Sequence, residues 1–488
     1  MGKYKKLISN TAILGIGTFS SKILVYLLMR FYTEYLTTGQ FSSADLITQS
    51  ANLLMPLAAC GIVESIFRFT LDKAENGKKS VVFSTGVNIL LISSAVFLLL
   101  SPLLFLADNF FGGYTWMIII YVLSANLHSA VAQYLRAKGE TVTFALQGLI
   151  NTALVIGFNI LFLAGFNMGV VGYVLSIIVS DTIVTVILVI SRRLWREYSI
   201  KIFDKSIAKE LLKYSLPMIP TTIFWWITSV SDRFMIIGML EGVLGAEGAK
   251  SVNGIYSAAQ KIPTIITLLT SIFMEAWHFS AVTETEDGQK DIETARADFF
   301  TEVFRSFSGL LFLACGGIIL LSEFLTRLMV SESYFSSWRF IPLLVIATTF
   351  SGLCSFMASV YVVEKKSMLS LFTSMAGAIS NIIMNILLIP EFGAMGAAIA
   401  TLVSYAVVLI IRTVNARAYV KFKINFAVLL LDIALVSVSA AFMTLILPYR
   451  YIVAVASLAI MLIVNGRPIF KAVFGILRSR LGRSRKQL

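Results

Sequence analysis

The chain has 488 residues, of which 57% are hydrophobic and 14% are charged, and its formal net charge is +13. A soluble globular protein of this length cannot accommodate so many apolar residues, so the composition excludes that class and predicts a protein solvated by lipid. The sequence contains no phosphate-binding glycine loop with a lysine, no zinc-ligand spacing and no nucleophile elbow. We therefore expect neither an enzyme nor a cofactor or metal site.

Apolar runs of about 20 residues, the helix length that crosses a hydrocarbon core of about 30 Å, predict fourteen transmembrane helices. They lie near residues 7–31, 43–66, 80–106, 115–135, 141–165, 170–190, 214–240, 254–276, 303–330, 340–362, 367–389, 394–413, 424–446 and 449–466. The expected fold class is therefore all-α, a polytopic membrane protein.

Most of the 40 basic residues fall in alternate connections between these spans. The main basic segments are the first six residues, residues 68–79, 192–213 and 412–423, and the tail after Arg467. Because basic connections stay on the cytoplasmic side, both termini are expected inside the cell. Topology thus accounts for the positive charge, and no nucleic acid is expected as a partner.

Two parts of the chain read alike at an offset of about 224 residues: Gly169-Val-Val-Gly172 and Gly393-Ala-Met-Gly396, each opening an apolar span. In addition, Ser50-Ala51 with Pro56 recurs as Ser257-Ala258 with Pro263. Six spans precede the basic linker, and an even number returns the chain to its starting side, so the two halves enter the membrane in parallel. Parallel repeats are typical of transporters in which two lobes rock about a central cavity.

The expected organisation has five parts. They are an N-lobe of helices 1–6 (residues 1–190), a cytoplasmic basic linker (191–213), a C-lobe of helices 7–12 (214–413), two further helices (424–466) and a basic cytoplasmic tail (467–488).

Ionisable side chains inside spans normally face a water-filled cavity or one another, because their burial in lipid is costly. They are concentrated in the first two spans of each half, where the basic ones are Lys22, Arg30, Arg233 and Lys261. If these spans line the cleft, the four side chains make it cationic, with Asp232 as a partial counter-charge. A cationic cleft selects anions, and arginine binds phosphate in bidentate geometry. The alternative is that Asp232 pairs with Lys261 or Arg30 to hold spans together.

Other charged residues are candidates for secondary roles. Glu64 and Arg68 end the second span and Glu275 lies near the inner end of the eighth, positions suited, like that of Asp232, to charge ordering or gating. Asp181 in the sixth span and Asp432 in the thirteenth are candidates for binding a coupling cation.

Prolines interrupt several of the same spans, at Pro56, Pro217, Pro220 and Pro263. Proline removes a helix hydrogen bond and kinks the helix, which suits a hinge for alternating access. Static kinks tolerated by packing are the other interpretation.

Five segments taken together resemble a known family. They are Asn10-Thr-Ala-Ile-Leu-Gly15, Tyr134-Leu-Arg136-Ala137, Ser231-Asp232-Arg233, Gly254-Ile-Tyr256-Ser257 and Gly393-Ala-Met-Gly396-Ala-Ala-Ile. In their order and spacing the chain resembles, over essentially its whole length, the polysaccharide or oligosaccharide flippases of the multidrug, oligosaccharidyl-lipid and polysaccharide (MOP) exporter superfamily.

The resemblance implies two six-helix lobes around a central cavity and a substrate that is a polyprenyl (undecaprenyl) pyrophosphate-linked oligosaccharide. Such a protein lies in the bacterial cytoplasmic membrane and moves its substrate to the outer leaflet for capsule, exopolysaccharide or O-antigen assembly. Lys22, Arg30, Arg233 and Lys261 would engage the pyrophosphate, and Asp232 would order them. Membrane lipids and the glycan polymerase or glycosyltransferases of the pathway are the expected partners.

Two alternatives within the superfamily stay open at this point: a flippase for the peptidoglycan lipid precursor and a cation-coupled multidrug exporter. Clustered bases and fourteen spans argue against the exporter. A membrane glycan polymerase would need a larger outer loop than the sequence provides.

Overall fold

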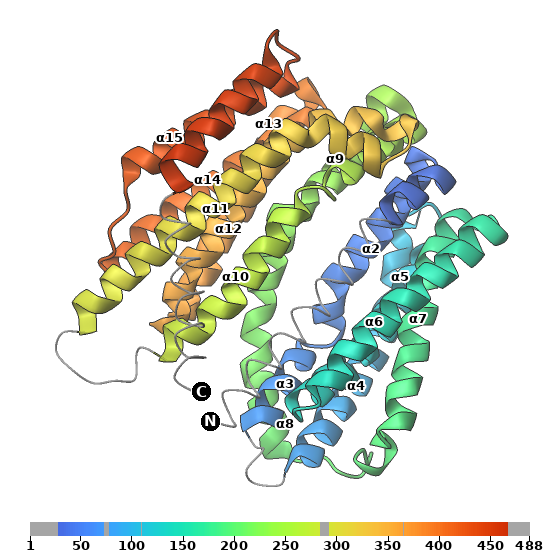
Figure 1. Cartoon of the computed structure of the whole chain (residues 1–488). Helices are drawn as coiled ribbons and strands as arrows, with labels where there is room; N and C mark the ends of the chain where they lie inside the picture. Colours follow the sequence, from blue (N-terminus) through green and yellow to red (C-terminus); the bar gives the residue numbers. More distant parts are fainter. Residues whose placement is uncertain (1–27, 73–77, 109, 284–291, 365, 467–488) are drawn as a thin grey trace, which may run out of the picture. The chain divides into compact units, whose positions relative to one another are not determined.

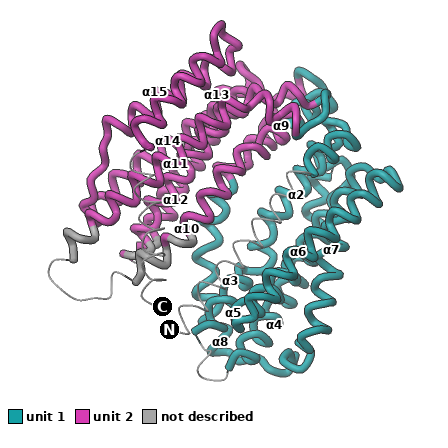
Figure 2. Tube along the Cα trace, in the orientation of Figure 1, with its two compact units in different colours: residues 1–226, 243–254, 329–333 teal, residues 227–242, 255–328, 334–488 magenta. Residues whose placement is uncertain are grey.

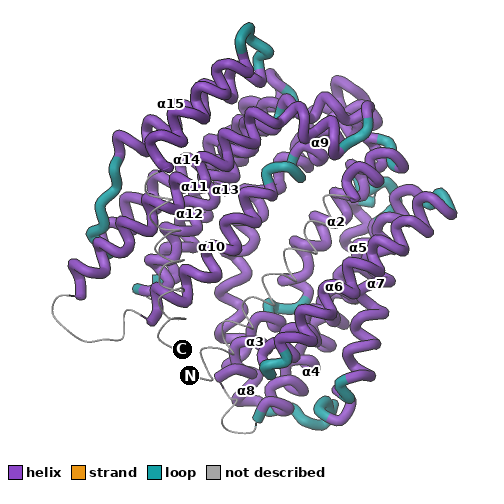
Figure 3. The backbone as a smooth tube through the Cα atoms, viewed as in Figure 1, coloured by secondary structure: helices purple, strands orange, loops and turns teal. Residues whose placement is uncertain are grey.

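The computed structural model describes residues 28–72, 78–108, 110–283, 292–364 and 366–466. Helices make up nearly all of these residues, and no strand occurs among them (Figures 1 and 3). After a helical segment at 28–35, the α-helices are α2 (Thr38–Ala58), α3 (Ile62–Asp72), α4 (Lys79–Leu100), α5 (Thr115–Ala137), α6 (Thr141–Asn159), α7 (Gly169–Ser191), α8 (Lys205–Ser215), α9 (Ile219–Ala259), α10 (Thr264–Thr283), α11 (Ile292–Met329), α12 (Ile341–Val363), α13 (Ser367–Phe392), α14 (Ala394–Tyr419), α15 (Phe426–Thr444) and a last helix, Arg450–Gly466.

The all-α, polytopic fold class is confirmed. Within the described ranges, ten helices are long and apolar enough to cross a membrane, and eleven if the bent pair α2 and α3 forms one span. Most of the first predicted span, 7–31, lies outside the described residues. The count of fourteen spans therefore stays a prediction.

The chain forms two compact units (Figure 2). Unit 1 comprises residues 1–226, 243–254 and 329–333, and unit 2 comprises residues 227–242, 255–328 and 334–488. The lobe boundaries expected from the sequence stay a prediction.

The linker expected at 191–213 folds onto unit 1. Asp204 caps α8 by accepting from the Ser206 and Ile207 N–H groups, and the apolar face of this short helix is buried. Ile207 and Leu211 are 3% and 0% exposed and pack in one cluster with Ile62. The linker thereby gains a buried apolar face as well as its basic one.

The helix pair α2 and α3 bends by 54° directly after Pro56. Cys60 and Gly61 both have positive φ, and the Gly61 N–H donates to the Pro56 carbonyl at 2.8 Å. The bend therefore coincides with the first expected hinge. Pro263 lies in the break between α9 and α10, whereas Pro217 and Pro220 lie at or just before the start of α9, where proline is tolerated.

Helix α9 joins the seventh and eighth predicted spans and has its single non-helical residue at Gly245, with φ 73°. Asp232 and Tyr256 would be about 36 Å apart along a straight helix, yet their side chains are hydrogen bonded, so the chain must turn back between them. Glycine at this position makes the left-handed backbone conformation accessible.

The second arm of α9 approaches the start of α2 very closely in unit 1. Thr38 and Ser251 share a hydroxyl hydrogen bond of 2.7 Å, and Asn253 donates to Ser42 at 2.8 Å. A Cβ on Gly254 would lie 1.9 Å from the Thr38 carbonyl oxygen. The family-like segment that begins at Gly254 thus marks a backbone contact.

We expect Gly254→Ala to destabilise the protein by about 1–3 kcal/mol, because the added methyl forces the two backbones apart. Gly238→Ala in the same helix is the control, since a Cβ there meets open space. Thermal unfolding of both variants in detergent tests this, and equal midpoints would contradict the close approach.

Candidate functional site

The centre of the candidate site is Asp232 in α9, which is 0% exposed within unit 2. The Tyr256 hydroxyl donates to its Oδ2, and the Thr401 hydroxyl of α14 donates to the same atom at 3.2 Å. The Arg233 N–H donates to Oδ1 at 2.9 Å. The carboxylate thus accepts hydrogen bonds from two hydroxyl groups and one backbone N–H. The alternative that Asp232 pairs with Lys261 or Arg30 stays a prediction.

Buried polar side chains of α13 continue this centre. Ser231 donates to Asn381 Oδ1 at 3.0 Å, and Asn385 Nδ2 donates to the same oxygen at 2.9 Å. Both asparagines are 0% exposed, and the Asn385 Oδ1 has no hydrogen-bond partner in the described part of the chain. A carboxylate with hydroxyl and amide oxygens nearby is a set that suits a hard cation or a proton.

The predicted basic residues divide between the units. Arg233, 6% exposed, and Lys261, half-buried in the break before α10, belong with Asp232 to unit 2. Arg30 belongs to unit 1, where it pairs with Glu34 at 2.7 Å and donates to the Val330 carbonyl at 2.6 Å. Lys22 lies outside the described residues. A single cavity shared by all four bases therefore stays a prediction.

The model of the polysaccharide biosynthesis protein family matches residues 7–278, more than half of the chain. The chain belongs to the polysaccharide biosynthesis protein family. No curated protein matches the sequence.

Three solved structures show the fold of this family member. The lipid II flippase MurJ in an inward closed conformation is 14% identical with a TM-score of 0.67, over 95% of this chain and 99% of that one. An inward-facing multidrug resistance MATE family transporter of the MOP superfamily is 13% identical with a TM-score of 0.61, over 82% and 98%. A MOP superfamily transporter from Pyrococcus furiosus, described as having a binding pocket of reverse polarity, is 13% identical with a TM-score of 0.56, over 86% and 96%. The likeness to these structures confirms the expected fold, and the family match confirms the expected resemblance to polysaccharide biosynthesis proteins.

Of the four residues predicted for charge ordering or gating, Asp232 is buried, two others are exposed, and the side chain of the fourth is not described. Glu64 and Arg68 are exposed on α3, and Arg68 pairs with Asp72 at 3.1 Å. Glu275 lies in α10, but its side chain is not among those described. Their gating role stays a prediction.

Asp181, a predicted cation ligand, lies in a polar cluster of unit 1. It is 6% exposed in α7, and its Oδ1 accepts from Asn151 of α6 at 2.9 Å. One turn on, Thr185 is hydrogen bonded to His128 of α5 at 3.2 Å. The aspartate and the histidine, which the sequence alone did not connect, thus lie near each other.

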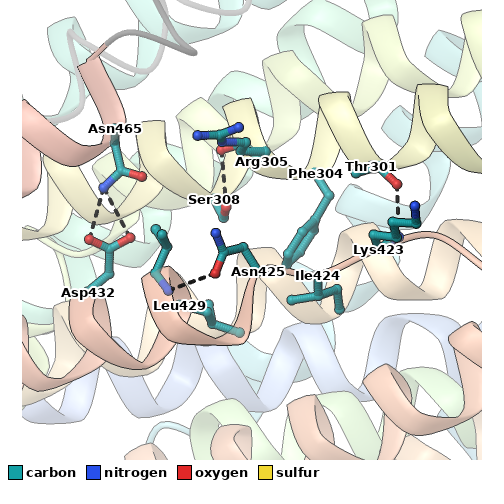
Figure 4. A pocket seen from close by; sticks show the side chains of 11 residues that line it. Thr301, Phe304, Arg305, Ser308, Lys423, Ile424, Asn425, Leu429, Asp432 and Asn465 are labelled. Atoms are coloured by element: carbon teal, nitrogen blue, oxygen red, sulfur yellow. Dashed lines mark hydrogen bonds between the residues drawn. The ribbon is translucent and has the colours of Figure 1, made fainter.

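Asp432, the other predicted cation ligand, is 2% exposed in α15. Both of its oxygens accept from the Asn465 amide, at 2.9 and 3.1 Å, and the two side chains line a cavity (Figure 4). Coupling roles for Asp181 and Asp432 stay predictions.

Sequence reasoning missed Arg412, which is 8% exposed in α14. Its guanidinium donates to Thr373 at 3.0 Å and Ser374 at 3.1 Å in α13, and to the Cys354 carbonyl of α12 at 3.0 Å. One side chain thereby ties three helices of unit 2. The signal was present, because the predicted span 394–413 contains this arginine, but it was counted with the basic connection 412–423. Asn381 and Asn385 were also missed, although their i, i+4 spacing in an apolar run is visible.

Proposed function

We propose that this protein is a flippase that moves polyprenyl (undecaprenyl) pyrophosphate-linked oligosaccharide from the cytoplasmic to the outer leaflet by alternating access. The product would serve capsule, exopolysaccharide or O-antigen-type assembly at a bacterial cytoplasmic membrane, with both termini inside. The observation that carries the proposal is that a member of the polysaccharide biosynthesis family with the MOP fold holds Arg233 and Lys261 in the same unit as the buried Asp232.

In this proposal the basic side chains hold the pyrophosphate while the glycan crosses through a wet cavity and the polyprenyl tail stays in lipid. Arg233 supplies paired N–H donors to phosphate oxygens, and Lys22, Arg30 and Lys261 add charge along the path. No bond of the substrate is made or broken, so the protein needs no catalytic group. The sharp bend after Pro56 and the break at Pro263 are the places where we expect the lobes to flex.

We further propose that Asp232 couples this movement to an ion gradient. Its carboxylate with the Thr401 and Tyr256 hydroxyls, beside Asn381 and Asn385, supplies oxygens of the kind that hold a sodium ion or exchange a proton. An ion that binds in only one conformation shifts the equilibrium between conformations by its differential affinity. The neighbouring Arg233 would link occupancy of the ion to occupancy of the anionic substrate.

Cells that lack this protein are expected to accumulate the lipid-linked oligosaccharide in the inner leaflet and to lose surface glycan. A membrane-impermeant glycosidase, which digests only the outer pool, measures the distribution. Normal pools together with accumulation of cationic dyes would identify a multidrug exporter instead. Inner-leaflet accumulation of the peptidoglycan precursor alone would identify a lipid-precursor flippase.

A further inference from the structure

A second polar site lies in unit 2, away from Asp232, where α11, α15 and the last helix meet (Figure 4). The cavity has a volume of about 200 Å³. This is far more than the roughly 10–15 Å³ that a single structural water requires. The space is therefore large enough for part of an organic ligand.

The cavity has a buried acidic end. Asp432 accepts both of its described hydrogen bonds from one nitrogen, that of Asn465, although a carboxylate offers about four acceptor positions. The Asn465 side chain is itself wedged against α11, because a Cβ on Gly309 would lie 3.0 Å from it. The Asp432 oxygens can therefore accept further hydrogen bonds from a ligand in the cavity that this side chain lines.

The remainder of the lining is basic and apolar. Arg305 of α11 and Lys423, just before α15, are exposed and form no ion pair within the described part of the chain. Phe304, Ile424 and Leu429 supply apolar walls. The cavity therefore presents two cations, one buried carboxylate and an apolar surface to the same ligand.

We propose that this cavity binds the headgroup of an aminophospholipid such as phosphatidylethanolamine. The ammonium group donates to Asp432, the phosphate lies on Arg305 and Lys423, and the chains follow the apolar wall into lipid. Asp432 lies about 9 Å along α15 from its first residue, and Lys423 precedes that helix, so the site lies at the end of a span, where headgroups are found. A purely anionic lipid would place a second negative charge beside Asp432. A choline headgroup has no N–H to donate.

The test uses the purified full-length protein in mild detergent with an equimolar mixture of phosphatidylethanolamine, phosphatidylcholine and phosphatidylglycerol, read by native mass spectrometry. The ethanolamine lipid is expected to be retained about tenfold more than the other two. A hydrogen bond to a charged group changes affinity by about tenfold or more. Asp432→Asn is expected to abolish this preference, and Arg305→Gln to weaken retention of all three lipids. Lys421→Gln, an exposed lysine outside the lining, is the control.

A wild-type protein without lipid preference, or an Asp432→Asn variant that keeps it, would overturn the proposal. If Asp432→Asn does not fold, Leu429→Trp fills the cavity without changing a charge and is expected to abolish retention. Soluble phosphoethanolamine is then added at a concentration similar to that of the lipid. If it displaces phosphatidylethanolamine, the apolar wall does not contribute to binding, and the assignment to a lipid is wrong. The lipid site is independent of the substrate that the protein moves, so failure of either proposal leaves the other standing.

Discussion

Replacement of Arg233 by glutamine is expected to reduce flipping about 10- to 100-fold while the protein remains in the membrane. Arg233 is 6% exposed beside Asp232, and glutamine keeps much of its length but removes its charge. Loss of charge-assisted hydrogen bonds to the pyrophosphate costs about 1.5–3 kcal/mol. Lysine at this position keeps the charge without the bidentate geometry, so Arg233→Lys should fall between the two. The impermeant-glycosidase assay measures each variant.

The control for this variant is Arg327→Gln, which removes an arginine of the same unit whose side chain is 72% exposed. A double variant separates substrate binding from simple charge balance. If Arg233 only offsets the buried Asp232, then Arg233→Gln added to Asp232→Asn should lower transport no further than Asp232→Asn alone. If Arg233 binds the pyrophosphate, the double variant should fall about 10- to 100-fold below Asp232→Asn. Normal transport by Arg233→Gln alone would contradict the role.

Asp232→Asn is expected to lower transport about 100-fold and to remove its dependence on an imposed ion gradient. The amide has the shape of the carboxylate, so Tyr256 and Thr401 can remain close, but it neither takes up a proton at neutral pH nor carries the charge that holds a cation. Reconstituted vesicles with a sodium gradient or a proton gradient, applied separately, measure the effect and identify the ion.

Glu241→Gln provides the matched control, because Glu241 is an exposed acidic residue of the same helix. Thermal unfolding of Asp232→Asn shows whether packing is intact. A variant that is stable and still responds to the gradient would exclude Asp232 as the coupling group. Asp181 with His128, the polar cluster of unit 1, would then be the next candidate.

The sequence by itself determined the class of this protein and its family. Whether a segment crosses a membrane depends on transfer free energy summed over about 20 consecutive residues, which is a local property. The family-like segments are also continuous in the sequence. Gly254 lies where two backbones approach closely, and in Ser231-Asp232-Arg233 the Arg233 N–H donates to the Asp232 carboxylate. The apolar pattern also predicts that Asp232 and Arg233 lie within a span.

Only the tertiary structure decided what these groups contact. Asp232 is satisfied by Tyr256 after a chain reversal at Gly245 and by Thr401 from α14, 169 residues away in the sequence. Arg412 joins α12, α13 and α14, and the linker helix α8 packs into unit 1. These partners depend on which faces of distant helices meet. Which faces meet is decided by close packing of side chains from several helices. The apolar pattern of a single span does not determine this packing.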